Sequence, residues 1–305
     1  MTAPRMTGQV WGLLLGLSVL WGGSFFFIAV IVRELPPFTI AALRVSLAAL
    51  VLVPVLYLLG RRLPRDPALW RAFATVGLLN NIIPFILIVW AQSQIPSGLA
   101  SILNATTPIW TALVAHVFTL DEKLTPNRVI GVLLGFGGVA AMLGPDLLSG
   151  LGHNVPAQCA VLLATLSYAF SGVYGRRFRR LGVEPIVVAG GQLTSAGVML
   201  LPLALVIDRS WMLPLPSMPV IAALLGLAVL STSLAYVIFF RVMAAAGSNV
   251  NLVTLLVPVS AILLGVLVLG ETLEPRHFVG IAVIALGLAA IDGRLLARLR
   301  RPQSG

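Results

Sequence analysis

Long apolar runs fill most of this sequence and constrain its fold more than any other feature. Ten runs of about twenty residues, each long enough to cross the hydrocarbon core of a bilayer as a helix, are separated by short polar stretches. They cover residues 9–32, 37–60, 70–91, 97–120, 127–145, 156–175, 185–207, 217–240, 247–270 and 276–296. Only 10% of the residues are charged, against about 25% in a soluble domain. The sequence therefore predicts an all-α polytopic membrane protein with ten transmembrane helices.

The basic residues predict how these spans are oriented. Sixteen of the twenty Lys and Arg residues fall in tails and loops on one side of the predicted membrane, three fall on the other, and Arg44 lies inside a span. The positive-inside rule then places both termini, including the tail at 297–305, in the cytoplasm. Because the basic residues form short clusters between apolar runs and pave no continuous face, we expect no nucleic-acid partner despite the formal charge of +10.

Groups that support catalysis or bind metals are sparse. The chain has a single cysteine, three scattered histidines and no carboxylate inside a predicted span. We therefore expect no disulfide, no metal site, no cofactor and no enzymatic activity. The lack of an intramembrane carboxylate also disfavours carboxylate-coupled proton antiport, so His116 is the candidate proton relay if transport is coupled to protons.

One pattern occurs twice, about 150 residues apart. In each copy a proline follows a glutamate by four residues and a glycine follows it by nine: Glu122, Pro126 and Gly131, then Glu271, Pro275 and Gly280. Five spans per copy is an odd number, so the second copy must cross the membrane in the opposite sense. We predict two five-helix repeats of inverted topology, at 9–145 and 156–296. Each glutamate is expected to be tied to a neighbouring helix N-terminus or to an arginine.

The motifs resemble a known family. The pattern Ser18-x-x-Trp21-Gly22-Gly23-Ser24, Arg44 in the second span and the two Glu-x-Leu-x-Pro turns are similar to the two EamA modules of drug/metabolite transporter superfamily proteins. Within that superfamily the chain most resembles bacterial exporters of amino acids and related metabolites, including the YddG-type aromatic amino-acid exporters. The resemblance implies a bacterial cytoplasmic (inner) membrane protein whose helices surround a central cavity, with the fifth and tenth helices at the periphery.

Polar and aromatic side chains inside the spans are the candidates for cargo binding, because they orient a small solute without the cost of burying a charge. The candidate substrate-binding residues are Trp21, Arg44, Asn80, Asn81, Ser101, Asn104, Tyr168, Gln192, Ser231, Tyr236, Asn251 and Thr254. Ser101 and Asn104 share one helical face, and Asn251 and Thr254 take the equivalent positions in the ninth span. The alternative is that these groups join neighbouring helices, and that Arg44 snorkels or pairs with carbonyls.

Three prolines inside spans, Pro84, Pro108 and Pro258, are predicted hinges, because each removes a backbone hydrogen bond. Together these features predict a secondary transporter that exports small neutral or zwitterionic metabolites by alternating access, as a facilitator or an exchanger. Aromatic and other neutral amino acids are the expected cargo. The alternatives are another cargo, namely a nucleotide-sugar, a phospho-sugar or a drug cation, or a proton-coupled antiporter that uses a histidine. The expected partners are the cargo and membrane lipid, and a monomer would suffice.

Overall fold

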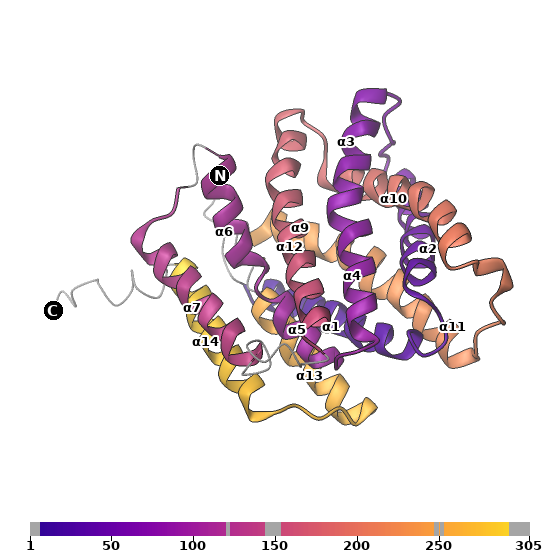
Figure 1. The fold of residues 1–305 in the computed structure, drawn as a ribbon. Coiled ribbons are helices and arrows are strands. Elements are labelled where there is room, and N and C mark those ends of the chain that lie inside the picture. The colour runs from indigo at the N-terminus through magenta and orange to yellow at the C-terminus, as the bar shows by residue number, and fades with distance from the viewer. Residues whose placement is uncertain (1–6, 120–122, 144–153, 247–249, 251–252, 293–305) are drawn as a thin grey trace.

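The computed structural model is all-helical and describes residues 7–119, 123–143, 154–246, 250 and 253–292 (Figure 1). Its long unbroken helices are α1 Gly8–Ile31, α2 Pro37–Leu58, α7 Pro126–Leu143, α9 Val155–Arg180, α10 Pro185–Ile207, α13 Val253–Leu269 and α14 Pro275–Asp292. Seven helical segments among the described residues are long and apolar enough to cross a membrane, and three apolar helices in α7, α13 and α14 are shorter. The predicted class of polytopic helical membrane protein is confirmed, whereas the count of ten spans stays a prediction.

The helix bounds follow the predicted apolar runs closely. The eighth run was predicted to end at residue 240, and its helix ends at Ala246. The sixth run also ends later than predicted. That run was predicted to end at residue 175, but α9 continues to Arg180 through a cluster of arginines. Cations are favourable in the last turn of a helix, where carbonyl groups lack intrahelical partners. The charged residues that end the apolar run therefore prolong the helix.

Two predicted spans contain a wide π-helical segment. The third consists of α3 Pro67–Gly77, η1 Leu78–Ile82 and α4 Ile83–Gln92. The eighth consists of α11 Met218–Leu225, η3 Gly226–Leu234 and α12 Ala235–Ala246. Such segments are rare and concentrate at functional sites. Both contain candidate binding residues, with Asn80 and Asn81 in η1 and Ser231 in η3.

The fourth predicted span is interrupted near its middle. It is made of α5 Ser97–Asn104 and α6 Thr107–Phe118, joined by a turn at Ala105 and Thr106. Pro108 occupies the second position of α6, just as Pro84 occupies the second position of α4 after η1. A proline is tolerated in the first turn of a helix because its missing N–H has no intrahelical partner there. Pro258 lies inside the continuous helix α13.

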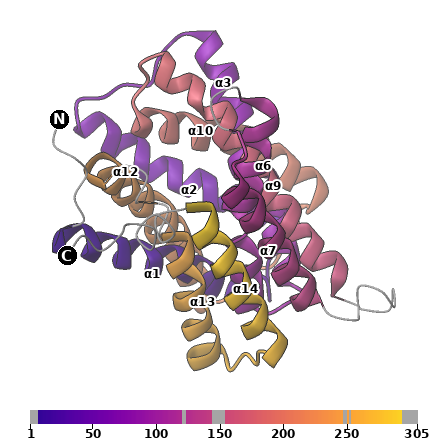
Figure 2. The ribbon, with the colours of Figure 1, turned by 90° about the vertical axis from the view of Figure 1, so that its left-hand side faces the viewer.

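Helices α7 and α14 lie side by side along one edge of the molecule (Figures 1 and 2). Glycines allow their backbones to touch. A Cβ atom on Gly138 would lie 2.8 Å from the carbonyl oxygen of Gly280, and one on Gly287 would lie 2.6 Å from the carbonyl oxygen of Gly131. Small residues at such crossings let helices pack by close van der Waals contact, which replaces the hydrophobic effect inside a bilayer.

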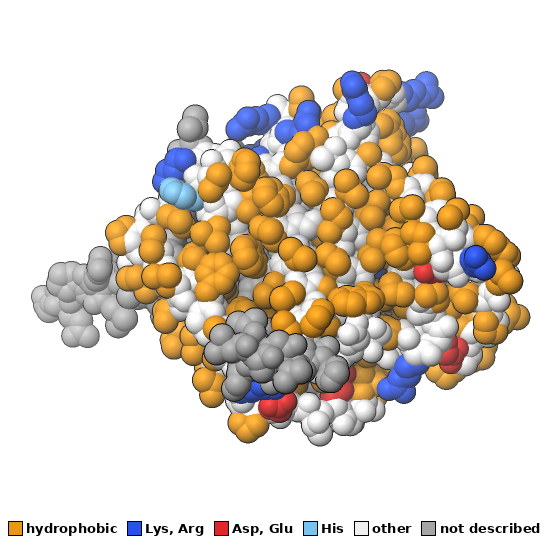
Figure 3. All heavy atoms as spheres, in the orientation of Figure 1, with side chains coloured by type: hydrophobic (Ala, Val, Ile, Leu, Met, Phe, Trp, Pro, Cys, Tyr) orange, Lys and Arg blue, Asp and Glu red, His pale blue; other side chains and the backbone are white. Residues whose placement is uncertain are grey.

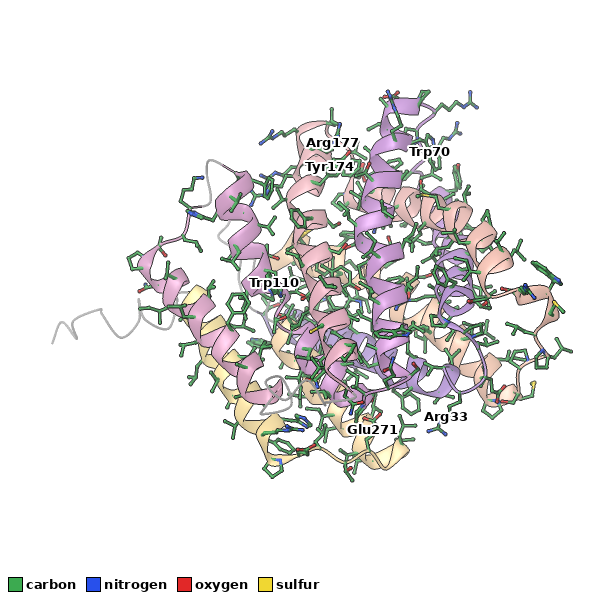
Figure 4. All side chains as sticks on the ribbon, in the orientation of Figure 1. Arg33, Trp70, Trp110, Tyr174, Arg177 and Glu271 are labelled. Carbon is green, nitrogen blue, oxygen red and sulfur yellow. The ribbon has the colours of Figure 1, made fainter. Side chains whose placement is uncertain are left out.

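The remaining helices pack around α1 and α9. Helix α1 contacts α13, α11, η3 and α12, while α9 contacts α5, α6, η1 and α4, and α2 packs along α10. On the face seen in Figure 3, apolar side chains cover the middle of the surface, and Lys and Arg gather mainly at one edge. We call this edge, which carries Arg177 and Trp70, the arginine end, and the opposite edge, which carries Arg33 and Glu271, the Glu271 end (Figure 4). The apolar surface between the two ends is suited to contact with lipid tails.

Carboxylates at the ends of helices bind the starts of other helices. The Asp208 carboxylate, after α10, accepts hydrogen bonds from the backbone N–H and the hydroxyl of Thr39 in α2, at 2.7 and 2.9 Å. The Glu34 carboxylate, after α1, accepts them from the backbone N–H and hydroxyl of Ser217, at 2.7 and 2.6 Å. A helix start offers unpaired N–H donors and a partial positive charge, so each carboxylate fixes one helix to another.

Candidate functional site

Arg44, in α2, is a buried cation. Its side chain is 7% exposed, and its Nε donates a hydrogen bond to the Thr232 hydroxyl in η3 at 3.1 Å. The guanidinium carbon lies 3.7 Å from the centre of the Phe85 ring in α4, a cation–π contact. No carboxylate pairs with Arg44 among the described residues. One hydrogen bond and one ring contact therefore offset only part of the free-energy cost of burying this positive charge.

The Tyr236 hydroxyl in α12 is the second centre of this region. It accepts hydrogen bonds from Asn80 Nδ2 and from Gln192 Nε2, both at 3.1 Å. A phenol oxygen has two lone pairs and one proton, so these bonds use its acceptor capacity and leave its O–H to donate. Asn81 adjoins the same hydroxyl and is fully buried. Neither of its amide atoms makes a hydrogen bond of standard geometry to a described residue.

The two centres form one group of side chains. Arg44 is close enough to Tyr236 in α12 and to Tyr168 in α9 to interact with both electrostatically. We call this group the Arg44–Tyr236 cluster, and its members are Arg44, Asn80, Asn81, Tyr168, Gln192 and Tyr236. The structure thus brings together six of the predicted substrate-binding residues, which come from α2, η1, α9, α10 and α12.

Trp21 is connected to this cluster through a row of aromatic rings. The ring of Trp21 in α1 lies 5.4 Å from that of Phe239, which lies 5.4 Å from Phe240. Phe240 in turn stacks on Tyr236 with centroids 6.0 Å apart. Sequence reasoning did not identify Phe85, Phe239 or Phe240 as part of the site. The sequence alone does not tell whether an aromatic residue in an apolar span lines a binding site or packs in the core.

The other predicted binding residues are not members of the cluster as defined above, and one of them is outside the described residues. Ser101 is fully buried, and its hydroxyl donates to the carbonyl of Gly98 in its own helix at 2.6 Å. Asn104 Oδ1 and Ser231 Oγ are buried without a hydrogen-bond partner among the described residues. Thr254 is partly buried in α13, and Asn251 is outside the residues that the structure describes.

The candidate proton relay His116 lies in the last turn of α6. Its Nδ1 accepts a hydrogen bond from the backbone N–H of Leu124 at 3.1 Å, and its carbonyl accepts one from Lys123 Nζ at 2.8 Å. These bonds tie the end of α6 to the segment that leads into α7. His116 therefore lies at a helix end and is not a member of the Arg44–Tyr236 cluster.

Comparison with known proteins identifies the family. The model of the EamA-like transporter family matches this chain twice, at residues 7–144 and 155–291. A protein of known crystal structure, 22% identical in sequence, superposes with a TM-score of 0.66 and covers 93% of this chain and 98% of its own. That likeness supports the fold alone.

Relatives along nearly the full length agree with the family match. The uncharacterized inner membrane transporter YedA of Escherichia coli K12 is 29% identical over 94% of this chain and 92% of its own length. Protein PecM of Dickeya dadantii is 27% identical over 92% of each chain. A probable amino-acid metabolite efflux pump of Escherichia coli K12 is 27% identical over 90% of this chain and 92% of its own. The chain therefore belongs to the EamA-like transporter family of the drug/metabolite transporter superfamily.

Proposed function

We propose that this protein is a secondary transporter that exports small zwitterionic metabolites, with aromatic and other neutral amino acids as its cargo. The observation that carries the proposal is the buried guanidinium of Arg44, which lacks a carboxylate partner among the described residues. The carboxylate of an amino acid would supply that partner through a charge-assisted and bidentate pair of hydrogen bonds. The relative described as a probable amino-acid metabolite efflux pump supports the same cargo class.

The rest of the cargo would be held by groups around Arg44. The Tyr236 hydroxyl has a proton to donate. The amide of Asn81, which makes no hydrogen bond of standard geometry to a described residue, offers both an acceptor and donors. The rings of Phe85, Phe239 and Trp21 supply apolar faces for an aromatic side chain. A site of this kind orients the cargo with a few polar groups on a largely apolar lining, as small-molecule sites commonly do.

Alternating access between two inverted five-helix repeats is the mechanism that we propose. The two separate matches to one family model support the repeat, and so do the π-helical segments in the third and the eighth predicted spans. The packing also agrees, because the first span contacts the ninth and eighth, and the sixth contacts the fourth and third. The π-helical segment before Pro84 and the turn before Pro108 would let half-helices move around the cluster.

We further propose that transport is driven by the cargo's own gradient or by exchange. The interiors of the described helices carry no carboxylate, which is the usual intramembrane proton carrier. The gathering of Lys and Arg at the arginine end supports placing that end in the cytoplasm, together with both termini.

The test is uptake of labelled phenylalanine, tryptophan, threonine and alanine into proteoliposomes, each with and without a pH gradient. We expect saturable uptake that the gradient leaves unchanged. Arg44→Gln should weaken apparent cargo affinity by about 10- to 100-fold, the value of a lost charge-assisted hydrogen bond. Arg62→Gln, which removes an exposed arginine, is the matched control and should transport normally.

Other outcomes would each remove a defined part of the proposal. Uptake that follows the pH gradient would replace the facilitator by a proton-coupled antiporter and direct attention to His116. Uptake of a phospho-sugar or a nucleotide-sugar in place of any amino acid would keep Arg44 as an anion-binding group and refute the amino-acid cargo. Equal transport by Arg44→Gln and the parent protein would refute the site.

A further inference from the structure

A hollow of about 320 Å³ lies at the Glu271 end, outside the Arg44–Tyr236 cluster. It is formed by the end of α1, the end of α4 and the segment that follows α13. Its polar lining consists of Arg33, Gln92, Ser93 and Glu271. Arg33 and Glu271 lie at the same edge of the molecule (Figure 4). The hollow thus combines a cation, an anion and an amide in one place.

The Glu271 carboxylate is tied to the start of α5, as the sequence predicted. Its Oε1 accepts a hydrogen bond from the Ser97 backbone N–H at 2.8 Å. Its Oε2 accepts two, from the Ser97 hydroxyl at 2.9 Å and from the Gly98 N–H at 3.1 Å. An ionised carboxylate can accept about four hydrogen bonds, so Oε1 retains a free lone pair. Glu122, the equivalent residue of the first repeat, is outside the described residues.

Gln92 is the observation that indicates a ligand. It is the last residue of α4, its side chain is 7% exposed, and it lines the hollow. Neither its Nε2 nor its Oε1 has a hydrogen-bond partner among the described residues. Buried amides in native proteins almost always make hydrogen bonds. A buried amide that lacks them and lines a hollow is therefore a candidate to bind a polar ligand.

We propose that this hollow is a second binding site for a zwitterion, at the point where cargo enters or leaves the protein. The exposed Arg33 guanidinium would bind the carboxylate of the zwitterion. Glu271 Oε1 and Gln92 Oε1 would share its ammonium group, whose three N–H donors can reach more than one acceptor. The inference rests on the proposed function for the choice of an amino acid as the ligand.

Occupancy of this site has a consequence for α5. An ammonium group on the free lone pair of Glu271 Oε1 shares that oxygen with the Ser97 backbone N–H and draws negative charge away from the existing hydrogen bond. Ligand binding would therefore weaken the attachment of α5 to the segment after α13. Helix α5 is the half of the interrupted fourth span that lies at the Glu271 end, and a turn separates it from α6. Ligand binding would therefore affect the half of the span that can move without α6.

The test uses the single cysteine of the chain. Cys159 is exposed, so Cys159→Ser gives a cysteine-free background in which Ser93→Cys places one thiol at the exposed edge of the hollow. Alkylation of this thiol by a membrane-impermeant maleimide is measured in detergent micelles with phenylalanine or alanine present. We expect either amino acid to slow alkylation, whereas propionate or ethylammonium alone, at the same concentration, should not.

Variants separate the site from unspecific effects. Gln92→Leu and Arg33→Gln should each raise the amino-acid concentration needed for protection by about tenfold or more. Arg209→Gln, which removes another exposed cation at the same end, should leave protection unchanged. The alkylation rate without ligand reports whether each variant keeps the fold, since it should match that of the parent.

The assay requires no transport, so it remains readable if the proposed function fails. Arg44→Gln should weaken the apparent affinity for uptake as stated above, yet leave protection of Ser93→Cys intact. If no amino acid slows alkylation, or if propionate or ethylammonium protects as well, the zwitterion site is wrong. If the amino acid protects the thiol at the same concentration in Gln92→Leu and Arg33→Gln as in the parent, the assignment of the binding groups is wrong.

Discussion

Gly138 allows the close contact between α7 and α14, and replacing it by alanine tests that contact directly. The new Cβ would lie 2.8 Å from the carbonyl oxygen of Gly280, 2.8 Å from Ile284 Cγ1 and 3.0 Å from the Ile284 backbone nitrogen. Two of these three atoms belong to the backbone of α14 and cannot turn aside as a side-chain tip can. The two helices must therefore move apart by several tenths of an ångström.

The size of the effect follows from two opposing terms. Overpacking of a close contact costs about 1–3 kcal/mol, and the higher helix propensity of alanine offsets up to about 1 kcal/mol. We expect Gly138→Ala to lower the free energy of unfolding by about 1–2 kcal/mol. Gly137→Ala is the matched control, because its Cβ would meet nothing within 4 Å. That substitution should raise stability by up to about 1 kcal/mol.

The measurement is reversible unfolding of the purified protein in mixed micelles, titrated with a denaturing detergent and followed by tryptophan fluorescence. The two alanine variants should shift the midpoint in opposite directions. Gly287→Ala, whose Cβ would lie 2.6 Å from the Gly131 carbonyl oxygen, should behave like Gly138→Ala. If Gly138→Ala proves as stable as Gly137→Ala, the close packing of α7 against α14 is refuted.

Three further predictions concern the cluster and the helix ends. Tyr236→Phe removes the acceptor of two N–H donors, so we expect it to cost about 1–3 kcal/mol of stability in the same titration and to weaken transport. Asn81→Ala should lower uptake of aromatic amino acids with little loss of stability, because its amide makes no standard hydrogen bond to a described residue; a large loss of stability with normal uptake would assign it to helix packing. Hydrogen bonds from Ser217 lower the pKa of the exposed Glu34 carboxyl below its ordinary value. The stability that the carboxylate contributes is therefore present above the ordinary pKa and is lost as pH falls through the lowered one. Ser217→Ala should return the Glu34 pKa toward its ordinary value, which ¹³C NMR of the labelled carboxyl would show.

The helix positions were predictable because a bilayer leaves a chain few choices. A run such as 37–60 must form a helix to satisfy its backbone, and the structure places α2 at Pro37–Leu58. The attachment of Glu271 to a helix N-terminus was predictable for a similar reason, since a carboxylate at a helix exit has few other favourable partners.

The local breaks and the partners of the site residues were not predictable. In a π-helical segment such as η1, backbone hydrogen bonds join residues five apart, whereas they join residues four apart in an α-helix. The composition of Leu78–Ile82 does not signal this change. The spacing of Ser101 suggested a cavity-facing hydroxyl, but a serine can satisfy itself on a carbonyl of its own helix, and Ser101 does so. The pairing of Arg44 with Thr232 joins residues 188 apart, which periodicity within one helix cannot reveal.

The carboxylates that cap helix starts at the Glu271 end also set an order of assembly during synthesis. Asp208 binds Thr39 in the first turn of α2, 169 residues earlier, and Glu271 binds Ser97 at the start of α5, 174 residues earlier. Ser217 reaches the ribosome exit 183 residues after its partner Glu34. The N-terminal ends of α2 and α5 therefore enter the membrane with unsatisfied donors and stay so until the second half of the chain is made. A nascent first half should depend on lipid headgroups, on water at the interface or on an insertase to cover those ends.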